Sequence, residues 1–214
     1  MLKVDRVRTS TKAIGKFEEV LIKRASDHFR QHGYKVFPHA RFTIAWGSSL
    51  SDLDILLVKN ETLTVIEVKS KRDKIARAGQ QMRRISDYID YGYVATDQLP
   101  KHWDDPRVGL LLVGETIETV DKAKRFKGRP TVESLSALQK KCLLRFLGGE
   151  PNSHILKYDV AETVRSMGSE ESIRRCLKKI VTCREHCETD CPVLRFAVRN
   201  GSKPLPSSFS ESYF

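Results

Sequence analysis

Residues 51–69 read SDLDILLVKNETLTVIEVK. Two apolar runs within this stretch, 54–58 and 63–69, are separated by the turn-like residues 59–61. Two short apolar runs joined by a turn of this kind predict a β-hairpin. We therefore expect two neighbouring strands in the middle of the first half of the chain.

The polar residues of this hairpin form a pattern of their own. Because side chains alternate along a strand, Glu67 and Lys69 point to one face of the sheet, while Ile66 and Val68 enter the opposite, apolar face. Asp54 opens the partner strand, so it can lie across from Glu67 and Lys69. The hairpin thus predicts two carboxylates that converge beside one lysine.

The segments on either side of the hairpin extend it to a larger sheet. Apolar residues at helical spacing predict a first helix, and Gly33 is a suitable residue to end it. The expected elements are a helix over 12–32, extended segments over 34–46 that are broken at Pro38, the hairpin, a helix over about 76–91, and strands at 93–95 and 109–113. This order, α-β-β-β-α-β-β, predicts an α/β fold with a mixed sheet flanked by helices.

The character of the sequence changes after Gly114. Residues 122–130 read KAKRFKGRP and hold five basic residues and no acid, which indicates a linker or an exposed arm. The expected organisation is a core over 1–118, a basic linker over 119–131, a helical, cysteine-containing module over 132–199 and a flexible tail over 200–214.

Composition limits the class of protein. The chain has 214 residues, of which 40% are hydrophobic and 30% are charged, so it can bury a core. It contains no apolar run of the ~20 residues that a membrane span needs, which predicts a soluble, cytoplasmic protein without a membrane partner. Its 38 Lys and Arg residues outnumber 27 Asp and Glu residues, and the net charge of +11 favours a polyanionic partner.

The carboxylates and the lysine of the hairpin suit the hydrolysis of a phosphodiester. Carboxylates hold hard divalent cations such as Mg²⁺, and a bound cation stabilises charge on a phosphate and lowers the pKa of bound water. Lys69 can orient or deprotonate that water, or neutralise the developing charge. The simpler interpretation of Glu67 and Lys69 on one face is a structural ion pair.

These residues resemble a known family. Asp54, twelve intervening residues and then Glu67-Val68-Lys69 are similar to the D…ExK signature of the PD-(D/E)xK nuclease superfamily. The resemblance covers residues 12–114 and implies a restriction-endonuclease-like αβββαβ core. The run SDYIDYGYVAT at 86–96 resembles small resolvase-like and DNA-repair members.

The resemblance also implies roles for single residues. Asp54 and Glu67 would bind Mg²⁺ or Mn²⁺, Lys69 would be catalytic, and Gln81 would orient the metal site or the scissile phosphate. Glu18, which shares a helix face with Leu21, would be an additional metal ligand from the first helix. The sequence departs from some branches at two positions, with Leu53 in place of a proline before the aspartate and Ile85 in place of a tyrosine, and Asp52 is a candidate accessory ligand.

A basic run follows the E-x-K residues. Lys71, Arg72, Lys74 and Arg77 are candidates for binding the phosphates of a nucleic acid, although such a run is also typical of a solvated surface.

Four cysteines form a second cluster of potential ligands. Cys176, Cys183, Cys187 and Cys191 have the spacing C-x6-C-x3-C-x3-C. In an intracellular chain this pattern favours a [4Fe–4S] cluster over Zn²⁺, because the C-x2-C of a zinc knuckle is absent, and free thiols or disulfides are the remaining alternatives.

The sequence hence predicts a Mg²⁺-dependent nuclease that hydrolyses DNA in repair, recombination or defence. RNA is not excluded as a substrate, and a homodimer is compatible with a resolvase-like nuclease. Two alternatives stay open, which are a non-cleaving nucleic-acid-binding module on a nuclease-like fold and a redox-sensing regulator that carries a cluster.

Overall fold

The computed structural model describes residues 16–43, 49–70, 75–136, 140–148, 154 and 156–182. The chain forms two compact units that divide between Lys127 and Gly128. The elements of the first unit are α1 (Lys16–Gln31), β1 (Lys35–Thr43), β2 (Ser49–Lys59), β3 (Thr62–Lys69), α2 (Ala76–Ile85), β4 (Tyr91–Thr96), β5 (Gly109–Val113) and β6 (Ile117–Asp121). The chain is therefore α/β in its first part, as the sequence predicts.

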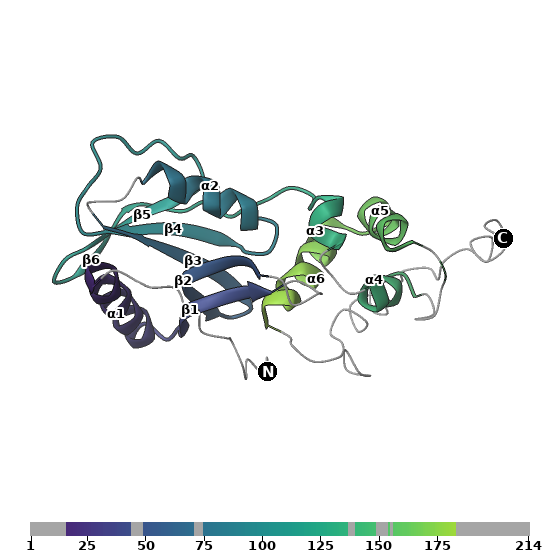
Figure 1. Ribbon diagram of the computed structural model, residues 1–214, viewed down its shortest axis with the longest axis horizontal. Coiled ribbons are helices and arrows are strands. Elements are labelled where there is room, and N and C mark those ends of the chain that lie inside the picture. Colours follow the sequence, from purple (N-terminus) through teal and green to yellow (C-terminus); the bar gives the residue numbers. More distant parts are fainter. Residues whose placement is uncertain are drawn as a thin grey trace. The chain divides into compact units, whose positions relative to one another are not determined.

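The sheet of the first unit is mixed. Its six strands lie in sequence order, with β1, β2 and β3 antiparallel, β3, β4 and β5 parallel, and β6 antiparallel to β5. Helix α1 lies on one face of the sheet and α2 on the other (Figure 1). The apolar side of α1 packs on strand residues that all point to its face, namely Ile55, Leu57, Ile66, Val68, Ala95, Leu111 and Val113.

The predicted hairpin between β2 and β3 is confirmed. Ile55 pairs with Ile66 and Lys59 pairs with Thr62, which leaves a two-residue loop. Both loop residues have positive φ, 48° for Asn60 and 62° for Glu61. Two positive φ angles define a type I′ turn, whose twist matches that of the flanking strands.

Strand β1 differs from the expectation that Pro38 breaks it. The strand continues through Pro38, which pairs with Ile55. Proline lacks an N–H, but β1 is an edge strand and does not need that donor on its outer side. The next residue, His39, has a positive φ of 52°, and the register with β2 shifts later, between Phe42 and Thr43.

Two further boundaries differ from those predicted. Helix α2 ends at Ile85 instead of extending to residue 91. Asp90 is already attached to β3, because its N–H donates to the main-chain oxygen of Leu63 at 2.8 Å. Strand β6 was not expected. Its residues are mostly exposed and polar, so it lacks the apolar pattern by which a strand is predicted.

The basic segment after β6 is part of the first unit and not a free arm. Residues 119–121, assigned to the linker from the sequence, belong to β6. Phe126 is buried, and its N–H donates to the oxygen of Asp90 at 2.8 Å. Arg125 donates from Nη2 to Asp90 Oδ1 at 3.0 Å. Ordered contacts of this kind hold the segment as far as Lys127, where Arg107 Nη1 donates to the main-chain oxygen at 3.4 Å.

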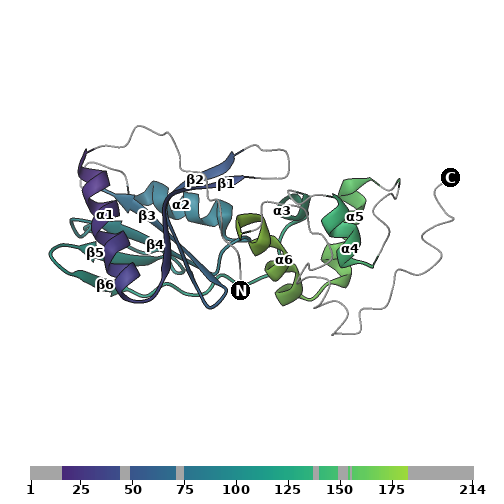
Figure 2. The ribbon, with the colours of Figure 1, turned by 90° about the horizontal axis from the view of Figure 1, so that it is seen from below.

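The second unit is helical in its described part. It contains α3 (Val132–Ser136), α4 (Lys140–Phe146), α5 (Lys157–Met167) and α6 (Glu170–Thr182) (Figure 2). Buried residues from all four helices form its core, namely Leu135, Leu143, Leu144, Val160, Val164, Ile173 and Leu177. No helix among the described residues is long and apolar enough to cross a membrane. The tail over 200–214 lies outside the described residues.

Candidate functional site

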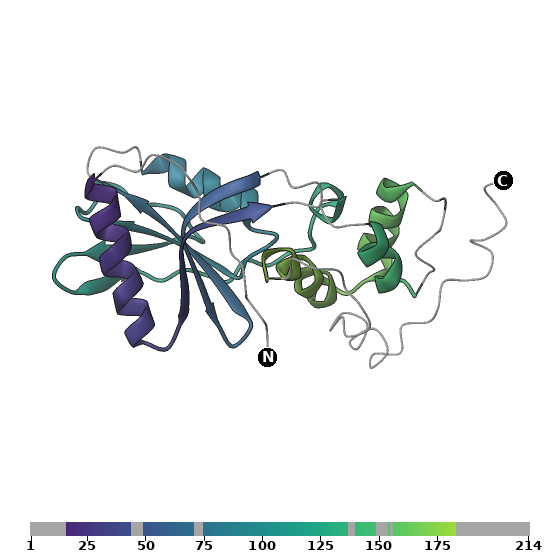
Figure 3. The same cartoon turned by 60° about the horizontal axis from the view of Figure 1, so that its bottom comes forward.

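The predicted site residues meet where two strands separate. The pairing of β2 with β3 ends at Ile55 and Ile66, so Asp54 and Glu67 are the next residues that face each other. Strand β2 continues with β1 beyond this point, and Figure 3 shows the two strands diverging from the end of β3. A fork of this kind leaves main-chain groups of β3 without a ladder partner. Asp54 supplies the missing partner for one of these groups, because its Oδ2 accepts a hydrogen bond from the N–H of Val68 at 2.7 Å.

Both carboxylates lie on the same face of the sheet. Ile66 and Val68 belong to the cluster under α1, so Glu67 and Lys69 point to the opposite face, on which α2 packs. The residues that carry the two carboxylates are almost completely buried, with 5% exposure for Asp54 and 2% for Glu67. Buried carboxylates require partners, because desolvation strongly disfavours an isolated charge.

Lys69 is the principal partner. Its Nζ lies 2.6 Å from Glu67 Oε1, and the two side chains are 12% and 3% exposed. Burial by itself would lower the pKa of Lys69, but the negative charges of Glu67, Asp54 and Glu18 outweigh it and raise the pKa. The ammonium group is consequently held charged between carboxylates from β2, β3 and α1.

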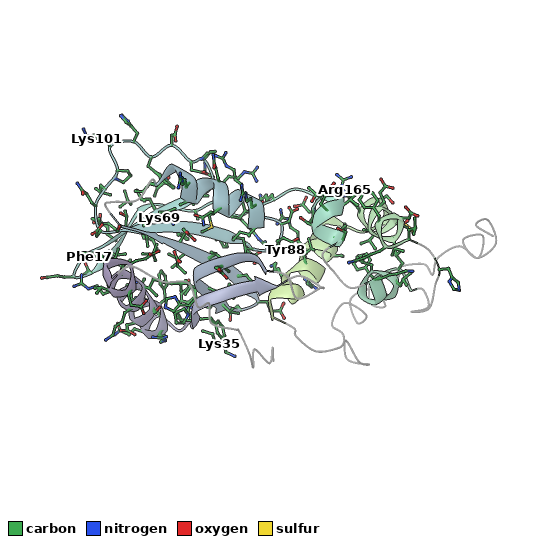
Figure 4. All side chains as sticks on the ribbon, in the orientation of Figure 1. Phe17, Lys35, Lys69, Tyr88, Lys101 and Arg165 are labelled. Atoms are coloured by element: carbon green, nitrogen blue, oxygen red, sulfur yellow. The ribbon has the colours of Figure 1, made fainter. Side chains whose placement is uncertain are left out.

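The first turn of α1 supplies the third of these charges. Glu18 is half-buried and acts electrostatically on Lys69, whereas Glu19 is exposed and pairs with His39 on β1, Oε2 to Nε2 at 3.3 Å. Figure 4 shows Lys69 at the end of the sheet where Phe17 and the start of α1 also lie, and Tyr88 at the other end. Acidic residues in a first helical turn are favoured by the helix dipole.

His39 was given no role from the sequence, yet it lies beside the site. The register of β1 and β2 places it opposite Asp54, and its φ is positive. Histidine is one of the few residues other than glycine that adopt this conformation. No spacing pattern in the sequence indicates that His39 lies beside the site, so its position could not be predicted.

The other predicted residues are more distant or lie outside the description. Gln81 on α2 is half-buried and makes no hydrogen bond to Asp54, Glu67 or Lys69 in the described part of the chain. Arg77 is exposed on the first turn of α2. Lys71, Arg72 and Lys74 lie outside the described residues, as do Cys183, Cys187 and Cys191, and Cys176 is known only as a position on α6.

The donor set at the fork fits a hard divalent cation. Asp54 and Glu67 provide carboxylate oxygens, which Mg²⁺ prefers, and Mg²⁺ commonly uses one or two carboxylates while it keeps several waters. Among the described residues, no group of three or more His, Cys, Asp or Glu side chains is placed to hold a metal. Glu18 is accordingly not positioned as a third direct ligand, and Lys69 takes the place beside Glu67.

Comparison with known proteins adds little to this geometry. No family model matches the chain, and no curated protein matches it. A solved structure of a protein of unknown function from Silicibacter pomeroyi is similar to it, with 25% identity and a TM-score of 0.40 over 51% of this chain and 73% of that one.

Proposed function

We propose that the chain is a metal-dependent nuclease with a restriction-endonuclease-like core, which hydrolyses phosphodiester bonds in DNA. The observation that carries the proposal is the meeting of Asp54, Glu67 and Lys69 at the fork between β2 and β3. The order of helices and strands through β4 is the αβββαβ order of such a core. Two buried carboxylates beside one lysine are an expensive arrangement for stability alone, since apolar residues would fill the same space at lower cost.

The residues would divide the work in the following way. Asp54 and Glu67 would hold Mg²⁺, which when bound stabilises negative charge on the phosphate and lowers the pKa of a coordinated water. Asp54 is oriented for this role by the N–H of Val68. Lys69 would leave Glu67 for the phosphate and neutralise the charge that develops there, or orient the attacking water.

A phosphodiester is the substrate that suits both the charge of the site and that of the chain. The buried carboxylates would repel an anionic substrate unless cations compensate them, and a divalent metal with Lys69 supplies that compensation. The net charge of +11 attracts a polyanion to the protein. A surface that only binds phosphates would not require carboxylates at this position.

The test is cleavage of labelled single-stranded, duplex and branched DNA, and of the matching RNA, with Mg²⁺ or Mn²⁺ and with EDTA. We expect metal-dependent cleavage of DNA that Asp54→Asn and Glu67→Gln abolish while DNA binding persists. Glu19→Gln is the matched control, because it removes an exposed carboxylate next to the site. Absence of cleavage on every substrate, or normal cleavage by Glu67→Gln, would refute the proposal.

A second candidate function has one observation in its favour. Glu67 is paired with Lys69, whose Nζ lies 2.6 Å from its Oε1, so a cation already neutralises this carboxylate. This suits a nucleic-acid-binding module that no longer cuts. DNA binding without cleavage under any metal condition would favour this alternative.

A further inference from the structure

Helix α2 has three sides that differ in what covers them. One side faces the sheet and carries Ala78, Met82 and Ile85, all of which are buried. Met82 lies so close to Gly92 on β4 that a side chain on Gly92 would meet its sulfur at 2.9 Å. This contact fixes the rotation of the helix on the sheet, so the positions of its remaining side chains follow from helical geometry.

The second side is covered by the loop between β4 and β5. Asp105 in this loop accepts the N–H groups of Arg107 and Val108, both at 3.0 Å, and it accepts Nη2 of Arg83 at 3.1 Å. Burial alone would raise the pKa of Asp105, but these donors lower it, so the carboxylate is charged and compensates Arg83. A side chain on Gly79 would lie 2.8 Å from the same carboxylate, so the loop approaches the helix closely.

The third side of α2 contains only basic and amide residues. We call it the α2 flank, and it consists of Arg77, Gln80, Gln81 and Arg84. At 100° per residue, all four positions fall within about 100° of one another around the helix. Arg77, Gln80 and Arg84 are exposed, and neither arginine has a hydrogen bond or an ion pair with another residue that the structure describes.

We propose that the α2 flank binds the phosphate backbone of a DNA strand and leads it to the site at the fork. The proposal rests on the proposed function for the identity of the substrate. Guanidinium groups bind phosphate oxygens through two parallel hydrogen bonds, and an amide side chain can donate one. No acidic or apolar residue of α2 lies between these four positions around the helix.

Spacing and position support the same partner. Arg77 and Arg84 are seven residues apart, which is about 10.5 Å along a helix and close to the rise of about three nucleotides of one strand. Helix α2 begins at Ala76, a short distance along the chain from Lys69, and packs on the face to which Glu67 and Lys69 point. A strand on the α2 flank would therefore continue toward the carboxylates.

The test is fluorescence anisotropy of a labelled DNA duplex in EDTA, with salt varied from about 50 to about 200 mM. The affinity K falls as salt rises, and each phosphate contact contributes about −0.9 to the slope of log K against log salt. Between about 50 and about 200 mM, one contact therefore accounts for a fall in K by a factor of about 3.5. We expect the ratio of the affinities at about 50 and about 200 mM salt to be about 3.5-fold smaller for Arg84→Gln than for the wild type, and about twelvefold smaller for the double variant of Arg77→Gln and Arg84→Gln.

Arg83→Gln is the matched control, since it removes the same charge from the next residue of the same helix, where Asp105 already compensates it. Its effect on the slope should be less than half that of Arg84→Gln. Equal slopes for Arg84→Gln and the wild type, equal losses for Arg83→Gln and Arg84→Gln, or losses confined to an RNA duplex would each overturn the proposal. Because the measurement contains no metal, it gives the same answer whether or not the protein cleaves.

Discussion

The ion pair at the fork between β2 and β3 predicts that loss of the Lys69 cation lowers the free energy of unfolding. Lys69→Met keeps most of the aliphatic side chain but removes the cation that lies 2.6 Å from Glu67. Removal of one partner from a buried ion pair costs ~3–5 kcal/mol. Lys69 is 12% exposed, which places the expected loss near the lower limit, at about 3 kcal/mol.

The pH dependence of this loss has a defined sign. Carboxylates raise the pKa of Lys69 above its ordinary value of 10.5 in the folded chain. A cation whose pKa is raised by folding stabilises the fold fully below its unfolded pKa, and the contribution disappears as the pH rises through the folded pKa. The difference between wild type and Lys69→Met should thus be constant around neutral pH and should shrink above pH 10.5.

Urea unfolding followed by tryptophan fluorescence measures the effect. In a thermal scan the same loss would lower Tm by about 6–12 °C for a chain of this size. Lys23→Met is the matched control, because Lys23 is an exposed residue of α1 and should change stability by less than ~0.5 kcal/mol. Equal stabilities of Lys69→Met and Lys23→Met would show that the carboxylates do not depend on Lys69, and the reasoning about the fork would fail.

Three further predictions concern the scaffold, each measured by urea unfolding. Glu61→Gly relieves a side chain at φ 62° and completes an Asn60-Gly type I′ turn, so it should stabilise by about 0.5 kcal/mol, and a loss would contradict the turn. Asp90→Ala removes the acceptor of the Leu63 N–H and the partner of Arg125, and should cost about 3 kcal/mol, whereas Asp90→Asn should cost less. Phe126→Ala should cost about 3 kcal/mol because Phe126 is buried, and a negligible change would mean that the segment is the free linker predicted from the sequence.

The hairpin shows how much of the fold local sequence can predict. Its two apolar runs and the turn at Asn60 and Glu61 are signals within about twenty residues, and they predicted the strands and the facing positions of Asp54 and Glu67. The same alternation predicted that Glu67 and Lys69 share a face. These features depend on the period of a strand, which is a property of the backbone alone.

Other features depend on partners that are distant in the sequence. Strand β6 forms because β5 offers it an edge, and its exposed polar residues carry no strand signal. The basic segment after β6 looked like an arm, but the buried Phe126 and the pairing of Arg125 with Asp90 attach it to the first unit. A count of charges cannot show this attachment, because Arg125 and Asp90 lie 35 residues apart along the chain.

The amino-acid sequence by itself determined the hairpin, the mixed α/β class and the three residues of the candidate site, since turn chemistry and alternation act locally. Only the tertiary structure decided that β2 leaves β3 at Asp54, that His39 has a positive φ, and that Arg77, Gln80 and Arg84 of α2 are exposed. The physical reason is that burial, strand pairing and charge compensation join residues across the fold. At the fork, Lys69 and the N–H of Val68 compensate carboxylates that burial would otherwise make unfavourable.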